Sequence, residues 1–212
     1  MDLIIYLKPD SILDIGVGFG KYGVLCREYL ELWDGRGRYS EFIRRIDGVE
    51  AFQNYITPLH RFVYSNIYVD DALDLIDKLD FNYDLVLLID VLEHFKKEDG
   101  QLLLNKILRK NKALLVSTPK KVSDQKDAFN NTYEIHQSQW TKHELSLLGN
   151  SFFVQDNISY IAYIARNIEL VNRVRKDFFR RKVKRIPGTA FIIKSYRRLM
   201  AKYKTVALKT WS

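Results

Sequence analysis

The feature that most constrains the fold is a glycine-rich segment near the start of the chain. Residues 11–23 read Ser-Ile-Leu-Asp-Ile-Gly-Val-Gly-Phe-Gly-Lys-Tyr-Gly, so an apolar run leads into three closely spaced glycines, Gly16, Gly18 and Gly20. Glycine lets the chain turn sharply and lets a ligand touch the backbone without a Cβ in the way. Apolar residues then recur at helical spacing up to residue 33. The segment therefore predicts a strand, a ligand-binding loop and a helix, in that order.

Strand-like and helix-like segments alternate as far as residue 165, the pattern of a largely parallel sheet with helices on both faces. The most apolar stretch, residues 83–90, is expected to be the central strand. Two β-like runs, 151–155 and 159–165, have no helix between them and predict an antiparallel hairpin at one sheet edge. Other strands are expected at 11–15, 45–52, 64–69 and 112–118, and helices at 21–33, 54–62, 72–79, 97–110 and from the capping box of Thr141 and Glu144 to Gly149.

Positive charge is concentrated at the C-terminal end of the chain. Residues 168–212 contain 14 lysines and arginines against only Glu169 and Asp177, a local charge of +12, whereas the whole chain carries +8. The part before it, 1–167, is therefore mildly acidic. This asymmetry predicts two parts, a catalytic or binding body at 1–167 and a basic extension at 168–212.

The extension has the pattern of an amphipathic helical hairpin. Apolar residues recur at helical spacing over 168–186 and over 191–204, on either side of Pro187-Gly188. Three partners fit such a segment: an anionic membrane surface, RNA, or the body or a second subunit, with the charges left in solvent. The sequence leaves these three open, and an oligomer is among them.

Cysteine usage and hydropathy bear on the compartment. The one cysteine, Cys26, excludes an intramolecular disulfide and a cysteine-rich zinc site. No apolar run approaches the roughly 20 residues that span a bilayer, and no signal peptide is recognisable at the N-terminus. We expect a cytoplasmic protein, either free or peripheral at the inner membrane surface.

Acidic residues follow the predicted strands at the edge where open α/β sheets bind ligands. Glu50 ends the second strand, where a carboxylate can accept hydrogen bonds from both hydroxyls of a ribose. Asp71 ends the third strand and suits an adenine amino group, and Asp90 ends the fourth. A dinucleotide site would have its third glycine at residue 21, which is Lys21, so the loop favours a cofactor without phosphates. A nucleotide-binding domain of the NAD type is the alternative.

Four motifs together resemble class I S-adenosylmethionine-dependent methyltransferases over about residues 10–165. They are Leu-Asp-Ile-Gly-Val-Gly-Phe-Gly, Gly-Val-Glu, Asp-Asp-Ala and Tyr-Asp-Leu-Val-Leu-Leu-Ile-Asp-Val-Leu-Glu-His. The resemblance implies a Rossmann-like, doubly wound, seven-stranded sheet with the last strand antiparallel. It implies that Glu50 binds the ribose, that Asp71 rather than Asp70 binds the adenine, and that Asp90 lies beside the methyl donor. The full set of cofactor-binding positions that it implies is Asp14, Gly16, Gly18, Gly20, Glu50, Asp71 and Asp90.

The acceptor side is expected near the ends of strands four and five. Methyl transfer requires alignment of the acceptor atom and, for a hydroxyl, removal of its proton. Glu93 and His94 follow the fourth strand, and His136 lies in a polar connection, 120–139, long enough to be a functional loop or lid. These three residues are the candidate catalytic groups. His60 and His143, in contrast, are expected on helix surfaces.

A divalent metal, Mg²⁺ or Mn²⁺, is a further hypothesis, with Asp90, Glu93, His94 and His136 as ligands. The pattern resembles the metal-dependent methyltransferases that modify the terminal 2′-hydroxyl of small RNAs. Those carry Glu-x-x-Glu-His, Thr-Pro and a histidine shortly before Trp-Thr; this chain has Asp90 in place of the first glutamate, then Thr118-Pro119 and Trp140-Thr141. The alternatives are that Glu93 and His94 only wall the cofactor pocket, and that His136 is a metal-free base or a structural residue.

Taken together, the residues and the resemblance predict an S-adenosylmethionine-dependent methyltransferase. Acid and base groups on the acceptor side favour transfer to oxygen, on a small-molecule, sugar or lipid-linked acceptor. Metal-dependent 2′-O-methylation of RNA is one alternative. A non-catalytic cofactor-binding module, which contacts RNA or a membrane through the extension, is the other.

Overall fold

The computed structural model describes residues 1–32, 41–123, 125, 127 and 129–184. The chain divides into two compact units, residues 1–172 and 173–212. A helix, α7 (Ile168–Lys184), occupies the first half of the predicted basic extension, and the second predicted stretch, 191–204, lies outside the described residues. None of the described helices is both long and apolar enough to span a membrane.

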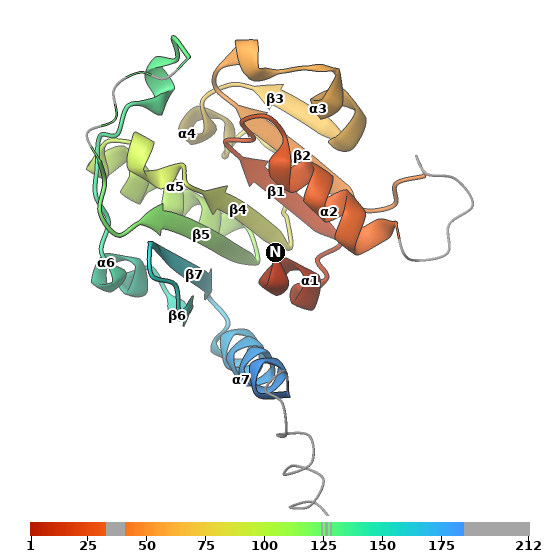
Figure 1. Ribbon diagram of the computed structural model, residues 1–212, viewed down its shortest axis with the longest axis vertical. Coiled ribbons are helices and arrows are strands. Elements are labelled where there is room, and N and C mark those ends of the chain that lie inside the picture. The colour runs from red at the N-terminus through yellow and green to blue at the C-terminus, as the bar shows by residue number, and fades with distance from the viewer. Residues whose placement is uncertain (33–40, 124, 126, 128, 185–212) are drawn as a thin grey trace, which may run out of the picture. The chain divides into compact units, whose positions relative to one another are not determined.

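The described part of the first unit contains a seven-stranded sheet with the order β3-β2-β1-β4-β5-β7-β6 (Figure 1). Strands β1 to β5 are parallel, and β7 is antiparallel to both β5 and β6. This confirms the predicted Rossmann-like sheet, its central strand β4 and its antiparallel edge hairpin. The strands are β1 (Ser11–Ile15), β2 (Arg45–Glu50), β3 (Asn66–Val69), β4 (Leu85–Ile89), β5 (Ala113–Pro119), β6 (Asn150–Val154) and β7 (Ser159–Ala165).

Helices cover both faces of the sheet, with α1, α2 and α3 on one side and α4 and α5 on the other (Figure 1). The helices of this unit are α1 (Asp2–Leu7), α2 (Lys21–Glu31), α3 (Pro58–Val63), α4 (Ala72–Leu75), α5 (Lys97–Lys110) and α6 (Lys142–Leu147). Short 3-10 turns are η1 (Gln53–Tyr55), η2 (Leu92–His94) and η3 (Thr132–Glu134). From β1 the chain continues to β2 in one direction along the sheet, whereas from β4 it continues to β5 in the other. The connections that follow β1 and β4 therefore diverge, although these two strands are neighbours.

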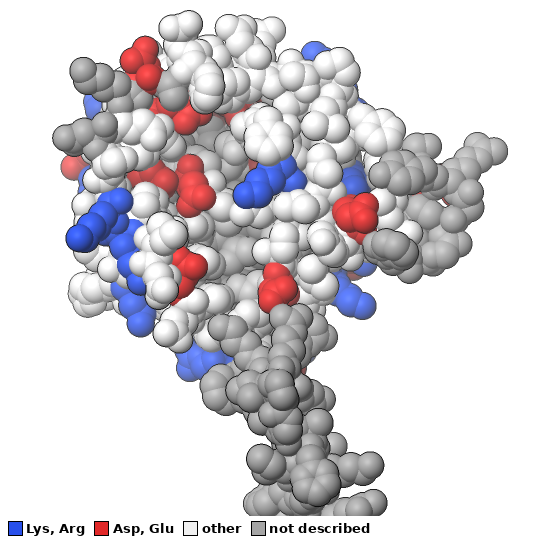
Figure 2. All heavy atoms as spheres, viewed as in Figure 1, with Lys and Arg blue, Asp and Glu red and all other residues white. Residues whose placement is uncertain are grey.

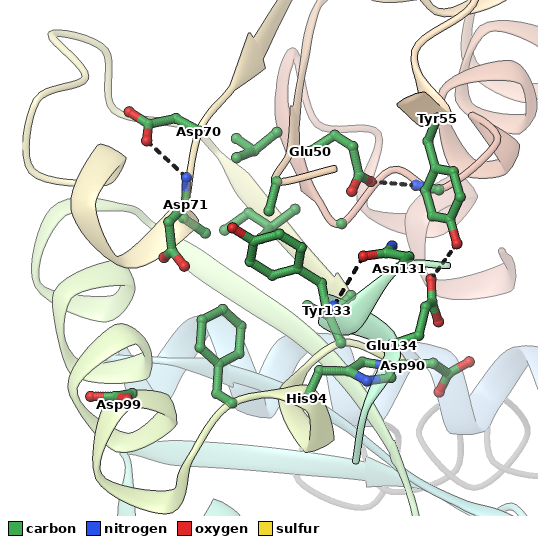
Figure 3. Close-up of a pocket in the computed structure, with 18 of the residues that line it drawn as sticks. Glu50, Tyr55, Asp70, Asp71, Asp90, His94, Asp99, Asn131, Tyr133 and Glu134 are labelled. Atoms are coloured by element: carbon green, nitrogen blue, oxygen red, sulfur yellow. Dashed lines mark hydrogen bonds between the residues drawn. The ribbon is translucent and has the colours of Figure 1, made fainter. Parts of the chain in front are cut away.

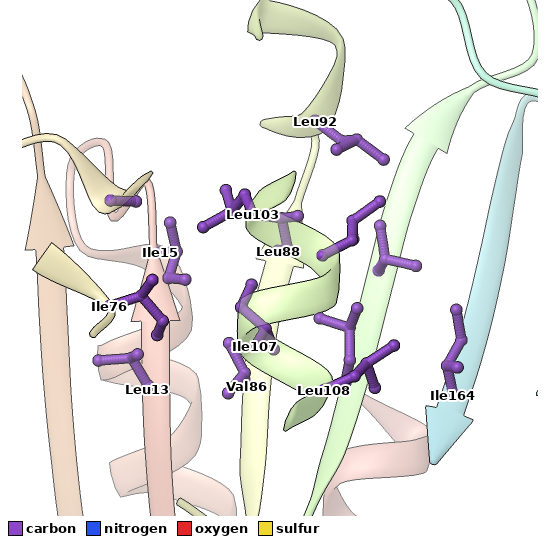
Figure 4. Packing of buried hydrophobic residues seen from close by; sticks show 14 of the residues in the cluster. Leu13, Ile15, Ile76, Val86, Leu88, Leu92, Leu103, Ile107, Leu108 and Ile164 are labelled. Atoms are coloured by element: carbon purple, nitrogen blue, oxygen red, sulfur yellow. The ribbon is translucent and has the colours of Figure 1, made fainter. Parts of the chain in front are cut away.

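The main core lies between α5 and the sheet (Figure 4). Leu103, Ile107 and Leu108 recur at helical spacing along α5 and are buried. They pack in the same cluster as Val86 and Leu88 of β4, which is buried because helices cover both of its faces. This packing fixes the carboxyl ends of the central strands, which carry the predicted site.

The segment predicted as one helix over 54–62 differs in the structure. It is split into η1 and α3, because Thr57 starts a new helix with a capping box and Pro58 occupies the first helical turn. His60, expected on the surface of this helix, is fully buried instead. Six residues are too few for hydrophobic periodicity to identify the buried face. Helix α1 was not predicted.

Candidate active site

A cavity of about 360 Å³ opens at the carboxyl ends of β1, β2, β3 and β4, where connections to either side diverge (Figure 3). Open α/β sheets bind ligands at this position. The predicted site residues that line it are Gly16, Gly18, Glu50, Asp71, Asp90 and His94. Asp14, Gly20, Glu93 and His136 lie outside its lining.

The glycine loop needs glycine for two physical reasons. Gly16 and Gly18 have φ angles of 72° and 54°, in the left-handed region that side chains disfavour. A Cβ on Gly16 would also collide with the side chain of Val91. Gly20 has a φ angle of 93° and begins α2 as its N-cap residue, so it shapes the end of the loop rather than the cavity wall.

Asp14 lies beneath the glycine loop, where it is 3% exposed. The hydroxyl of Tyr64 donates a hydrogen bond of 2.6 Å to its Oδ2 atom. Burial raises the pKa of Asp14 to about 7, a rise that the Tyr64 hydrogen bond opposes and the charge of Glu50 reinforces. Asp14 therefore supports the loop from below. Because it does not line the cavity, it can influence ligand binding only through the conformation of the loop.

Glu50 connects the end of β2 to the glycine loop. Its Oε2 accepts from the backbone N–H of Gly18 and its Oε1 from that of Phe52, both at 3.0 Å. Burial raises the pKa of Glu50, although these two hydrogen bonds oppose the rise. The carboxylate is thus fixed at the cavity wall, where it can also accept hydrogen bonds from a ligand.

The adjacent acids after β3 have different partners. Asp71 is the N-cap of α4 and accepts from the backbone N–H of Leu73 at 2.8 Å. The Asp70 carboxylate turns back to the backbone N–H of Asp71 and also lies 3.8 Å from Lys78 Nζ (Figure 3). Both residues line the cavity. That Asp71 rather than Asp70 faces the ligand therefore stays a prediction.

Asp90 closes β4 in an unusual backbone conformation. Its φ angle is 55°, which is uncommon for a residue with a side chain and recurs at functional sites. Its Oδ1 accepts from the Ser117 hydroxyl at 2.9 Å, and its N–H donates to the Ser117 carbonyl. These bonds to β5 hold the strained residue at the cavity wall.

Three of the predicted acceptor-side residues converge. One carboxylate oxygen of Glu93 and one ring nitrogen each of His94 and His136 all lie within 4.8 Å of one another. Glu93 is 2% exposed, and its Oε2 has no hydrogen-bond partner among the described residues. Burial raises the pKa of Glu93 to about 7, with a contribution from the charge of Asp90. Asp90 itself is not part of this cluster, and its Oδ1 is hydrogen-bonded to Ser117 instead.

Both imidazoles of the cluster are oriented by backbone carbonyls. His94 Nδ1 lies 3.4 Å from the Ile135 oxygen, and His136 Nδ1 lies 2.8 Å from the Ser123 oxygen. A carbonyl only accepts, so each Nδ1 carries the hydrogen and each Nε2 keeps a lone pair. Metal-binding histidines are held in this way. Burial also lowers the pKa of His94, which favours the neutral ring.

The connection 120–139 forms part of the cavity wall, as its unusual length predicted. Its lining residues are Asn131, Tyr133, Glu134 and Gln137. The Tyr55 hydroxyl donates to Glu134 Oε1 at 2.9 Å, which ties the connection to the segment after β2 (Figure 3). Tyr55 and these lining residues could not be predicted from the sequence, because a contact across 79 positions leaves no local pattern.

No family model and no curated protein matches the sequence, whereas many solved structures match the fold. An O-methyltransferase family protein from Burkholderia thailandensis aligns with a TM-score of 0.55 and 13% identity, over 77% of this chain and 52% of that one. The methyltransferase domain of bacterial CtHen1 aligns with a TM-score of 0.52 and 17% identity, over 77% and 94%. The N-terminal domain of EvdMO1 with S-adenosylhomocysteine bound aligns with a TM-score of 0.53 and 13% identity, over 75% of each chain.

The chain thus spans about half the length of the Burkholderia protein and nearly all of the CtHen1 domain. At identities below a fifth, these likenesses establish the fold. The cavity lies at the carboxyl ends of the parallel strands, and β7 is antiparallel to β5 and β6. The chain therefore has the Rossmann-like fold of class I S-adenosylmethionine-dependent methyltransferases.

Proposed function

We propose that this protein is an S-adenosylmethionine-dependent methyltransferase. The observation that carries the proposal is the cavity wall, where Gly18 backbone, Glu50 and Asp71 meet at the positions that bind this cofactor in the family that the sequence resembles. Asp90 lies on the same wall, at the position that lies beside the methyl donor in that family. Bound there, S-adenosylmethionine would supply an electrophilic methyl group. A related fold with S-adenosylhomocysteine bound supports the assignment.

The cluster of Glu93, His94 and His136 favours transfer to oxygen. His94 lines the cavity, and its Nε2 is free to accept a proton from an acceptor hydroxyl. His136 lies beside it, with ring centroids 4.9 Å apart. The residues also fit a divalent cation, since two oriented imidazoles lie within 4.8 Å of a carboxylate oxygen of Glu93, and this buried carboxylate has one oxygen, Oε2, without a hydrogen-bond partner among the described residues. Mg²⁺ or Mn²⁺ held there would favour deprotonation of the acceptor hydroxyl.

The charge of the cavity favours an uncharged acceptor. Among the described residues, its lining holds one lysine, Lys96, and six acidic residues: Glu50, Asp70, Asp71, Asp90, Asp99 and Glu134. Acidic side chains are visible on the upper part of the face in Figure 2, over the carboxyl ends of the strands. A polyanion would meet like charge at close range, whereas the hydroxyl of a small molecule, a sugar or a lipid-linked glycan would not. RNA is the second candidate, favoured by the Glu93-His94 and Trp140-Thr141 motifs and by the likeness to the CtHen1 domain.

Calorimetric titration with S-adenosylmethionine, S-adenosylhomocysteine and NAD⁺ tests the cofactor. We expect the first two to bind and NAD⁺ not to bind. Glu50→Gln is expected to weaken both by about ten-fold, the effect of losing hydrogen bonds to a charged group. Binding of NAD⁺ alone, or of none of the three, would overturn the assignment.

Transfer of a labelled methyl group to a panel of acceptors then tests the substrate class. We expect product with uncharged polyol or glycoside acceptors. Product with short RNA alone would replace that acceptor class by the second candidate.

A further inference from the structure

The glycine loop is held from its far side by helix α3, through a histidine that does not line the cavity. His60 is fully buried, and its Nε2 lies 2.8 Å from the carbonyl oxygen of Gly18. Its Nδ1 lies 3.1 Å from the backbone nitrogen and 3.0 Å from the hydroxyl of Thr57. The ring also faces Gly20, where a Cβ would come within 3.4 Å of Nε2.

These partners select one tautomer of His60. The backbone N–H of Thr57 can only donate, so Nδ1 must accept. The hydrogen of the neutral ring is therefore on Nε2, from which it is donated to the Gly18 carbonyl. Because the same capping box starts α3, the helix and the orientation of the imidazole are fixed together.

Gly18 is consequently restrained on both of its peptide groups. Its N–H donates to Glu50 at the cavity wall, and its carbonyl accepts from His60. A glycine with φ near 54° is otherwise free to rotate its peptide planes at little cost. The next residue, Phe19, is 72% exposed and offers little packing to restrain that rotation. Without His60, the partly buried Gly18 carbonyl would lose its donor, unless it turned elsewhere.

Tyr64, one helical turn after His60, also holds the segment that forms the loop. Tyr64 stacks on His60 with ring centroids 6.2 Å apart. Its hydroxyl donates to Asp14 and accepts from the backbone N–H of Gly23 at 3.1 Å. His60 and Tyr64 thus hold the start, the middle and the end of the segment that forms the loop.

We propose that His60 is a positioning residue for the cofactor. By donating to the Gly18 carbonyl it keeps the loop in its ligand-binding conformation, so that affinity for S-adenosylmethionine depends on a side chain that does not contact it. This inference rests on the proposed function, because it assumes that the loop binds this cofactor.

Two amide variants separate the hydrogen bond from the volume of the ring. In His60→Gln the amide nitrogen can reach the place of Nε2 and donate to Gly18. In His60→Asn the shorter amide reaches only the place of Nδ1. We expect His60→Asn to weaken cofactor binding about ten-fold, the effect of losing the donor to the Gly18 carbonyl, and His60→Gln to weaken it less than three-fold. At saturating cofactor, kcat should be unchanged in both, so the effect appears in KM for the cofactor.

Three further measurements make the result decisive. Thermal unfolding reports the loss of ring packing, which both variants share, so a purely structural role predicts similar binding by the two. Thr57→Val removes the hydroxyl that contacts Nδ1 and provides a milder test if His60→Asn does not fold; we expect a two- to three-fold loss of affinity. His143→Asn changes an exposed histidine of α6 and should leave binding unchanged.

Equal affinity of the Asn and Gln variants, or for Thr57→Val an affinity equal to that of the wild type, would overturn the role of His60. Failure of the wild type to bind S-adenosylmethionine would instead overturn the proposed function. The two failures are therefore distinguishable.

Discussion

Asp14 lies at a position where burial and function impose opposite demands on one carboxyl group. It has almost no contact with solvent, and the Tyr64 hydroxyl donates to it. Burial disfavours the charged form, which raises its pKa to about 7. A ligand with positive charge above the loop would favour the charged form. At neutral pH the unliganded protein therefore holds a group near the midpoint of its titration.

We expect Asp14 to lower the unfolding free energy of the unliganded protein as the pH rises from about 4 to about 7. The pKa of Asp14 in the folded state lies above the value of 3.8 for an exposed aspartate. The unfolded chain therefore loses this proton first, and ionisation favours unfolding across that interval and not above it. Urea denaturation at a series of pH values measures the slope.

Asp14→Asn provides the matched comparison for that slope. The buried Glu93, whose pKa is also raised to about 7, contributes in the same direction. Asp84 contributes in the opposite one, because burial raises its pKa less than the hydrogen bonds from Lys112 and Ser11 lower it. The difference in slope between Asp14→Asn and the wild type therefore isolates Asp14, and the slope should be less negative in the variant. A slope that is the same in Asp14→Asn and in the wild type would show that Asp14 ionises normally.

At the scale of elements, the bounds of helices and strands were predicted best where a single local sequence pattern determines the element. The bounds of β1 and α5 match the prediction to the residue, because the glycines end the strand and the apolar spacing of α5 is sustained for four turns. The capping box of Thr141 and Glu144 is also confirmed. Helix α3 shows the limit: its buried histidine contacts a loop 42 positions away, which no local pattern records.

The candidate site shows the same division. The motifs predicted correctly which acidic residues follow the strands, because each of these residues is adjacent to its strand in the sequence. It also included Asp90 in a four-residue metal set, whereas the structure brings Glu93 and His94 of η2 together with His136 alone. The shorter arm of Asp90 is visible in the sequence, but its hydrogen bond to Ser117 is not.

Glu93 and His94 of η2 lie close to His136 of the connection 120–139, and this cluster leads to a prediction on metal binding. We expect the wild type to bind Mn²⁺, and Glu93→Gln and His136→Ala to weaken this binding by at least ten-fold, because each removes one of three ligands. Asp90→Asn is the matched control and should retain the affinity, since its carboxylate lies outside the cluster. Calorimetric titration with Mn²⁺ measures all four proteins. If the wild type does not bind the ion, the cluster acts through its bases alone.

At the scale of the whole molecule, charge is distributed so that the two parts of the chain suit different partners. The extension at 168–212 carries +12, and the rest of the chain is mildly acidic. The cavity lining is also acidic. An RNA acceptor bound by the extension would have to bring its phosphates to like charge at the methyl donor. A lipid-linked acceptor with an uncharged hydroxyl avoids that conflict, because anionic lipid stays at the extension.

We therefore expect the protein to bind vesicles that contain anionic lipid. Replacing four exposed basic residues of α7 by glutamine should lower the partition coefficient at least ten-fold, since each cation near such a surface contributes about 1 kcal/mol. The four are Arg173, Arg175, Lys176 and Arg180. Glutamine is nearly as good a helix former, so α7 should persist. The matched control replaces four exposed basic residues of the body, Arg61, Lys121, Lys142 and Arg166, and should bind as the wild type does.

Salt and nucleic acid then distinguish the outcomes of this experiment. Raising the ionic strength shortens the Debye length and should release the wild type from vesicles, whereas neutral vesicles should not retain it at any salt concentration. Methyl transfer to a soluble acceptor should be equal in both four-residue variants, because the charges act on location and not on chemistry. Tight binding of short RNA that the α7 substitutions abolish, without vesicle binding by the wild type, would assign the extension to nucleic acid and the acceptor with it. Binding to neither would leave the apolar face of the extension to pack within the protein or against a second subunit.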